Sequence, residues 1–155
     1  MSWEAIEAIR RLKYAYFRLL DTKQFVALGE LFIPDATTAY ESGNLSQRGR
    51  GEIVAFLQEA LGGPGIVTMH HGHHPEIDLV GPDRATGTWY LEDRVLIPGA
   101  DLEISGTALY TDEYVLVDGS WRIAHTGYER IFEEHRSHTT GASISLRTRF
   151  DRAAG

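Results

Sequence analysis

The most concentrated set of chemically active side chains is a run of four histidines within five positions: His70, His71, His73 and His74. Histidine changes its charge near neutral pH, so it serves both as a general base and as a metal ligand. If the segment is extended, His71 and His73 project from one face and could bind a metal ion. Alternatively, one histidine enters a cavity as a general base while its neighbours face solvent. A third interpretation is that all four are solvated at a junction between strands.

A phenol and a carboxylate near the amino terminus form a second set of candidates. Tyr16 lies on the apolar stripe of a predicted helix, so its ring should face inward and its hydroxyl needs a partner there. Asp21 follows five residues later, about 140° around a helix axis, which places it at the helix end and off that stripe. Tyr16 is therefore either a core residue or a hydrogen-bond donor in a site. Asp21 either caps a second helix that starts near Gln24 or acts in a site.

Two further charged residues lie on predicted strands. Trp89, Leu91 and Asp93 share one face of an alternating run, so Asp93 extends an otherwise apolar surface. If that surface lines a cavity, Asp93 is partly buried and could orient a histidine; otherwise it is a solvated carboxylate at a strand end. Arg130 lies near the end of the predicted last strand, where a surface ion pair with a neighbouring glutamate is the alternative to a functional role.

The spacing of apolar residues predicts three helices that must position these groups. The first begins near Ser2 and carries an apolar stripe that repeats every three or four residues. The second includes Phe32 and ends at Pro34, because proline cannot continue the helical hydrogen-bond pattern. The third includes Ile53 and ends at Gly62.

Beyond residue 65 the period changes to the alternation of β-strands. The dipeptide Asp118-Gly119 predicts a tight hairpin, because both residues tolerate positive φ. Two short extended segments, 37–40 and 45–48, predict an edge hairpin. The long strands are expected at 66–71, 76–80, 84–97, 102–116 and 121–132. Helices followed by a long, curved, mostly antiparallel sheet indicate an α+β fold with helices on one face and a pocket between them.

Composition limits the possible functions. The 155 residues, 43% of them hydrophobic, are enough for one core, so we expect a single domain over residues 1–155 with a polar tail from about 136. A net charge of −7 argues against a nucleic-acid partner. The absence of cysteine excludes disulfides, thiolate metal sites and a cysteine nucleophile. Charged residues interrupt the first eleven positions, which argues against a signal peptide or membrane segment and predicts a cytoplasmic protein.

Four stretches, 16–21, 69–77, 85–93 and 126–135, carry a resemblance to a known family. The chain resembles the SnoaL-like enzymes of the nuclear-transport-factor-2-like (NTF2-like) superfamily, and among them the bile acid 7α-dehydratases and, more distantly, the scytalone dehydratases. The resemblance implies a cone-shaped α+β barrel with a cystatin-like fold. It also implies a homo-oligomer, either a trimer or a dimer. His71, His74 and a shorter connection around 98–104 depart from the family pattern.

The resemblance further implies a cofactor-independent dehydratase that removes water from a hydrophobic polycyclic, steroid- or polyketide-like hydroxy-ketone. No metal, nicotinamide or flavin is expected. His70 would be the base, Asp21 would orient and charge it, Tyr16 would donate a hydrogen bond, and Asp93 would assist proton delivery or hold His70. The catalytic residues implied are Tyr16, Asp21, His70 and Asp93, and the substrate-binding residues are Trp89 and Arg130. A double-bond isomerase and a non-catalytic binding domain are the alternatives.

Overall fold

The computed structural model describes residues 2–148 and 151. In this part of the chain, three α-helices combine with a seven-stranded sheet. The helices are α1 (Ser2–Asp21), α2 (Phe25–Gly29) and α3 (Arg50–Leu61), and the short 3-10 turns are η1 (Glu41–Gly43) and η2 (Pro98–Ala100). The strands are β1 (Phe32–Tyr40), β2 (Leu45–Arg48), β3 (Val67–Leu79), β4 (Arg84–Ile97), β5 (Leu102–Val117), β6 (Ser120–Ser137) and β7 (Ser143–Thr148).

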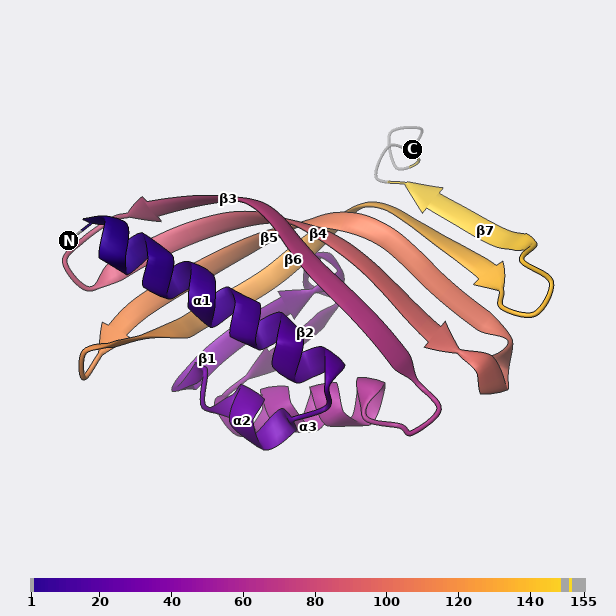
Figure 1. Ribbon diagram of the computed structural model, residues 1–155, viewed down its shortest axis with the longest axis horizontal. Coiled ribbons are helices and arrows are strands. Elements are labelled where there is room, and N and C mark those ends of the chain that lie inside the picture. Colours follow the sequence, from indigo (N-terminus) through magenta and orange to yellow (C-terminus); the bar gives the residue numbers. More distant parts are fainter. Residues whose placement is uncertain (1, 149–150, 152–155) are drawn as a thin grey trace.

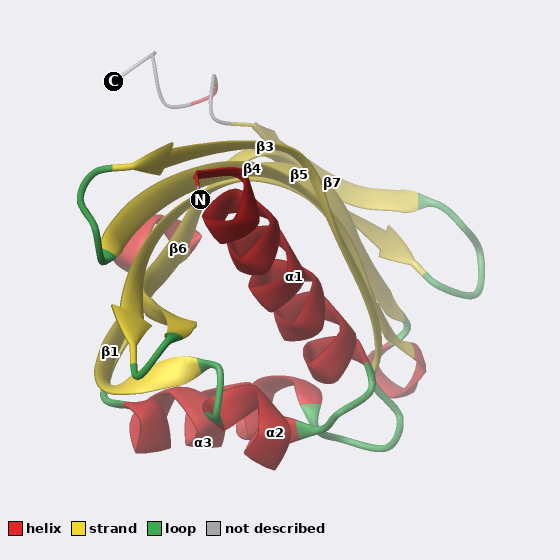
Figure 2. Ribbon diagram, turned by 60° about the vertical axis from the view of Figure 1, so that its left-hand side comes forward, coloured by secondary structure: helices red, strands yellow, loops and turns green. Residues whose placement is uncertain are grey.

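The sheet is open and strongly curved. Its strand order is β2-β1-β6-β5-β4-β3, and β7 pairs with the far end of β6. All neighbouring strands are antiparallel except β1 and β6, which are parallel. The long strands bend around α1, which lies within the curve, while α2 and α3 lie across its lower opening (Figures 1 and 2). The predicted α+β arrangement is therefore confirmed, with the helices closing a cone that the strands leave open.

We call the side of the sheet that faces α1 the inner face and the opposite side the outer face. Along β4 burial alternates at every residue from Arg84 to Val95, so Trp89, Leu91 and Asp93 face inward. The stripe of α1 meets this face through Ile9 and Tyr16, both almost fully buried. No glycine or proline interrupts α1, and its buried stripe runs from Ile9 to Leu20. The core therefore fills the space between α1 and the inner face.

Several predicted elements are confirmed. The first helix begins at Ser2, the third ends at Leu61, and β1 and β2 form the expected edge hairpin. Asp118 and Gly119 connect β5 to β6 with φ values of 50° and 75°. Both residues of the hairpin turn thus have the positive φ that their types favour.

The predicted second helix is too long. It ends at Gly29, and Phe32 and Pro34 lie in β1 instead. Phe32 is fully buried opposite Ile123 of β6, and the backbone N–H of Ile123 donates to the carbonyl of Leu31 at 2.8 Å. A short apolar run fits a strand as well as a helix, so pairing with β6 decides its state. Pro34 falls where the β1–β6 register shifts, and there its missing N–H interrupts no ladder bond.

The runs at 66–71 and 76–80 are one strand, β3, with an irregularity between His73 and Glu76. His74 has a φ of 50° at this point, and Pro75 follows it. An extra residue in one strand bends it without ending the pairing, which explains why β3 continues through the gap between the two predicted runs. The predicted polar tail includes the end of β6 and β7, while residues 149–150 and 152–155 lie outside the described part.

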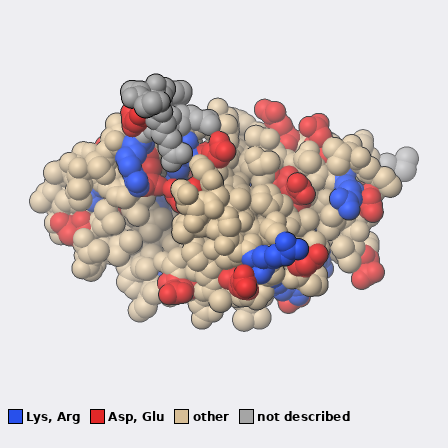
Figure 3. Space-filling model, turned by 180° about the vertical axis from the view of Figure 1, so that it is seen from behind, with Lys and Arg blue, Asp and Glu red and all other residues tan. Residues whose placement is uncertain are grey.

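The described helices include none with the length and apolar character needed to cross a membrane. On the face seen in Figure 3, basic side chains occur as small separate groups beside acidic ones. The visible part of this face therefore has no large basic patch.

Candidate functional site

The end of α1 and the first half of β3 bring a carboxylate and an imidazole together. Asp21 is the last residue of α1, and its Oδ1 lies 2.6 Å from Nδ1 of His70. The backbone N–H of His70 donates to Oδ2 at 2.9 Å, and the hydroxyl of Thr68 donates to Oδ1 at 2.8 Å. Asp21 does not cap the second helix, since Gln24 occupies that N-cap position without a side-chain bond. Three hydrogen bonds fix this carboxylate against one ring nitrogen.

This arrangement sets the charge of Asp21. Partial burial raises the pKa of Asp21, but the hydrogen bonds from His70 and Thr68 and the attraction of His70 outweigh burial and leave that pKa below its ordinary value. An ionised Asp21 accepts a hydrogen bond from the Nδ1–H group of His70, so the lone pair on Nε2 is available to another group. Among the described residues, none forms a hydrogen bond with Nε2 of His70. Only 8% of the His70 side chain is exposed, so water has little access to it. We call Asp21 and His70 the dyad. Its geometry, with Nδ1 bonded and Nε2 unbonded, is the one that a general base requires.

Tyr16 finds its partner in another tyrosine. The hydroxyl groups of Tyr16 and Tyr40 lie 2.8 Å apart, and both residues are buried. Burial raises the pKa of both phenols well above the ordinary value, so both stay protonated and one of them always donates to the other. The sequence missed Tyr40, although its place at the end of a predicted extended segment was a weak signal. Within the described chain, no hydrogen bond links this phenol pair to the dyad.

Asp93 is held by Arg130 in a two-point ion pair. Nη1 and Nη2 of Arg130 lie 2.5 and 2.8 Å from the two carboxylate oxygens, and Asp93 is 5% exposed. Burial lowers the pKa of Arg130, but the bonds to Asp93 outweigh burial and raise that pKa. Gly106 makes room for the pair, because a Cβ there would lie 2.4 Å from the carbonyl oxygen of Phe132 and 3.3 Å from Nη1 of Arg130. Arg130 is thus fixed on the inner side and is not only a partner of surface glutamates.

The register of the sheet relates Asp93 to the dyad. His70 and Asp93 are directly opposite each other on β3 and β4, and both are buried. Their side chains therefore leave the sheet on the same face. The Asp93 carboxylate is bonded to Arg130, while His70 is bonded to Asp21. The structure thus brings His70, Asp21, Asp93 and Arg130 to the inner face, as two bonded pairs.

Trp89 lies deeper than a residue expected to bind substrate. It is fully buried, and its indole N–H donates to the hydroxyl of Tyr114 at 3.0 Å. The tryptophan is part of the core between α1 and the sheet. Its role in substrate binding stays a prediction.

The sequence analysis missed a buried ion pair. Nζ of Lys13 lies 2.7 Å from Oδ2 of Asp112, and neither side chain is exposed. Thr126 and Tyr114 donate to Asp112 at 2.6 Å each, and Nζ of Lys13 lies 3.7 Å from the ring centroid of Tyr110. Burial lowers the pKa of Lys13, while Asp112 acts in the opposite direction. A lysine within an apolar helical stripe, one turn before Tyr16, was the signal that could have revealed it.

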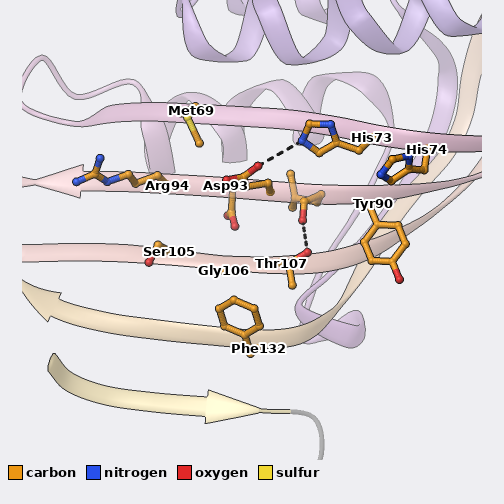
Figure 4. Close-up of a pocket in the computed structure, with 12 residues that line it drawn as sticks. Met69, His73, His74, Tyr90, Asp93, Arg94, Ser105, Gly106, Thr107 and Phe132 are labelled. Carbon is orange, nitrogen blue, oxygen red and sulfur yellow. Dashed lines mark hydrogen bonds and ion pairs between the residues drawn. The ribbon is translucent and has the colours of Figure 1, made fainter.

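A hollow of about 670 Å³ lies on the other side of the same strands. Figure 4 shows that His73, His74 and Tyr90 lie together at one end of it and Phe132 beside it, with Arg94 towards the other end. Neither His70 nor Asp21 lines this hollow. The outer hollow and the inner dyad are therefore separate features of β3 and β4.

Comparisons with known proteins agree with this architecture. A SnoaL-like domain model matches residues 1–127. A scytalone dehydratase-like protein from Novosphingobium aromaticivorans is 22% identical, with 98% of this chain and 97% of that chain covered and a TM-score of 0.80. A hexachlorocyclohexane dehydrochlorinase, LinA-type3, from Novosphingobium barchaimii is 20% identical, with 83% and 88% covered and a TM-score of 0.74.

An NTF2-like protein with a cystatin-like fold, also from Novosphingobium aromaticivorans, is 22% identical, with 83% of each chain covered and a TM-score of 0.69. At these identities the structural likenesses establish the fold alone. The match to the domain model covers most of the chain, from α1 into β6. The chain therefore belongs to the SnoaL-like domain family.

Proposed function

We propose that this protein is a cofactor-independent lyase that eliminates water from a hydrophobic polycyclic hydroxy-ketone. The observation that carries the proposal is the dyad, in which Asp21 binds Nδ1 of His70 at 2.6 Å and leaves Nε2 unbonded within the described chain. Membership of the SnoaL-like family supports an enzyme that converts small molecules. Two structurally similar proteins are named a dehydratase and a dehydrochlorinase, and both names denote elimination reactions.

The reaction begins with proton transfer to His70. Nε2 removes a proton from a carbon next to the substrate carbonyl, and the ionised Asp21 stabilises the imidazolium that forms. The electrons of the broken C–H bond form a carbon–carbon double bond as the bond to the hydroxyl group breaks. The departing hydroxyl takes the proton from His70 and leaves as water. An elimination of this kind involves no net oxidation, so acid–base groups are sufficient.

The phenol pair and the arginine pair would position and polarise the substrate. One O–H of the Tyr16–Tyr40 pair, whose hydroxyl oxygens lie 2.8 Å apart, would donate to the carbonyl oxygen as it gains negative charge. Arg130 would bind a polar end of the substrate, and Asp93 would hold the guanidinium in place through its two bonds. Asp93 thus acts in this proposal through Arg130, because its carboxylate is already engaged.

The test is turnover of a panel of polycyclic hydroxy-ketones, with products identified by mass spectrometry. Loss of one water supports the proposal, whereas a product of unchanged mass would indicate the isomerase. His70→Ala and Asp21→Asn should each lower turnover by about 10²- to 10⁴-fold, the usual contribution of a general base. His74→Ala is the matched control in the same strand, because His74 lies on the outer hollow. Full activity of either dyad variant would reject the mechanism.

A further inference from the structure

We propose that His71, His73 and Glu92 form a binding site for a divalent transition-metal ion on the outer face of the sheet. The site goes beyond the elimination reaction, which uses the inner face and needs no metal. His71 and His73 alternate with the buried His70 along β3, and all three members of the outer group are exposed. An ion could therefore reach them from solvent without entering the core.

The strand pairing brings three ligand atoms together. Glu92 of β4 is directly opposite His71 of β3, and His73 lies two residues further along the same strand. One ligand atom from each side chain lies within 4.8 Å of the other two. Nε2 of His73 is already 3.3 Å from Oε2 of Glu92. Two ligands of a tetrahedral zinc ion, each about 2.0–2.1 Å from the metal, are separated by about 3.3 Å, so this pair needs almost no adjustment.

The third ligand can approach by side-chain rotation alone. The rings of His71 and His73 are 5.9 Å apart between centroids and nearly perpendicular. Both side chains are in solvent, so a change of rotamer meets little resistance from packing. The backbones of β3 and β4 are paired from Val67 to His73, and again from Glu76 to Leu79 beyond the irregularity. The sheet therefore fixes the Cα positions and leaves the last adjustment to side chains.

The ligand types select the class of metal. Two imidazoles and one carboxylate suit zinc, nickel, cobalt and copper, whereas magnesium and calcium prefer sites made of oxygen ligands. Arg94, the nearest cation along β4, pairs with Glu103 at 2.8 and 3.0 Å, which reduces its repulsion of a bound cation. Three protein ligands leave a fourth position for water. His73 and Glu92 also line the outer hollow (Figure 4).

Binding has a structural consequence for the sheet. β3 is an edge strand of the main strand path and carries His70 on its inner face. A metal bound by two residues of β3 and one of β4 would link the edge strand to its neighbour. Anything that binds only the folded state also raises the stability of that state. We therefore expect zinc to raise the melting temperature of the protein.

The experiment uses the full-length chain without a histidine tag, after treatment with a chelator and dialysis. Isothermal titration with zinc chloride should show one equivalent binding with a dissociation constant of about 1–100 μM, typical of an exposed three-ligand site. Magnesium and calcium should show no binding under the same conditions. Lowering the pH from about 7.5 to about 5.5 should weaken zinc binding more than tenfold, because protons compete for imidazole.

Substitutions separate this site from other histidines. His71→Ala, His73→Ala and Glu92→Gln should each weaken zinc binding at least tenfold, with unchanged circular dichroism. His138→Asn, at an exposed histidine outside the group, should leave the affinity unaltered. Zinc binding that persists in His71→Ala and His73→Ala would overturn the proposal, and so would a dissociation constant above about 1 mM for the unaltered chain. These outcomes do not depend on whether the protein is a dehydratase.

Discussion

The two faces of β3 and β4 carry nearly the same residue types and put them in opposite environments. On the inner face His70 and Asp93 are almost completely buried, His70 bonded to the carboxylate of Asp21 and Asp93 to the guanidinium of Arg130. On the outer face His73 and Glu92 are about half exposed and 3.3 Å apart. Adjacent residues in sequence thus end in a buried histidine–carboxylate pair and in a solvated histidine–glutamate cluster.

Under both proposals, the environment of each side chain, and not its residue type, distinguishes the two roles. A buried imidazole fixed by a carboxylate has one free nitrogen and one direction of action, as a base needs. Exposed imidazoles keep the rotational freedom to close around an ion, as a metal site needs.

The largest loss of stability is expected when a buried ion pair is broken, compared with an exposed one. Lys13→Met should lower the free energy of unfolding by about 3–5 kcal/mol, because it leaves Asp112 buried without its counter-ion. Urea denaturation measures the change. Arg94→Met, at the exposed pair with Glu103, should move the denaturation midpoint far less. The double variant Lys13→Met/Asp112→Leu should regain much of the loss, and a single variant as stable as the original chain would contradict the inner–outer contrast.

Gly72 of β3 tests how tightly α1 packs against the inner face. A Cβ at Gly72 would lie 2.4 Å from the ring of Phe17, so Gly72→Ala should destabilise the protein by about 1–3 kcal/mol through overpacking. Thermal denaturation gives the difference. Equal stability of Gly72→Ala and the original chain would mean that α1 can move away from the sheet, and that the inner face is less tightly packed than the structure indicates.

Acid stability tests the dyad. The pKa of Asp21 is lowered in the folded protein, so its ionised form stabilises the fold above the unfolded pKa of about 3.9. That contribution is lost as the pH falls through the lower, folded pKa. Asp21→Asn should therefore be less stable than the original chain near neutral pH, and the gap should close below about pH 4. Unfolding measured from pH 7 to pH 3 checks this, and a constant gap would show that proton linkage at Asp21 is not the cause.

The smallest effect is expected on the outer face. With a chelator present, His73→Ala should change the free energy of unfolding by no more than about 0.5 kcal/mol, because its side chain is 44% exposed and its bond to Glu92 is long. Urea denaturation with and without chelator makes the comparison. A large loss under chelator would mean that His73 already stabilises β3 without any ion.

The sequence was informative where the signal was local. The stripe of α1, the alternation along β4 and the turn at Asp118-Gly119 each depend on neighbouring residues, and the structure has all three. The prediction that the second helix includes Phe32 was wrong, because the apolar spacing there suits both a helix and a strand. Pairing with β6, which is distant in sequence, decided between them.

In the candidate site, too, some features follow from local sequence and others from packing. Alternation alone separates His70 and Gly72 from His71 and His73, but it does not say which set faces inward. Packing decides this, because Phe17 of α1 fills the space that a side chain at position 72 would occupy. Tyr40 and Lys13 were missed for the same reason, since their partners lie on other elements.

Local sequence was enough for the period of each long element, the tight hairpin between β5 and β6, and the separation of His70 from His71 and His73. His74 does not follow this alternation, because the irregularity in β3 places it on the outer hollow. The tertiary structure decided which set is buried, which carboxylate meets which base, and where a short apolar run joins the sheet. The two kinds of feature depend on interactions over different distances along the chain. Periodicity and turn preference act between neighbours, whereas burial and ion pairing depend on contacts between distant segments, whose closure only the packing of the whole chain stabilises.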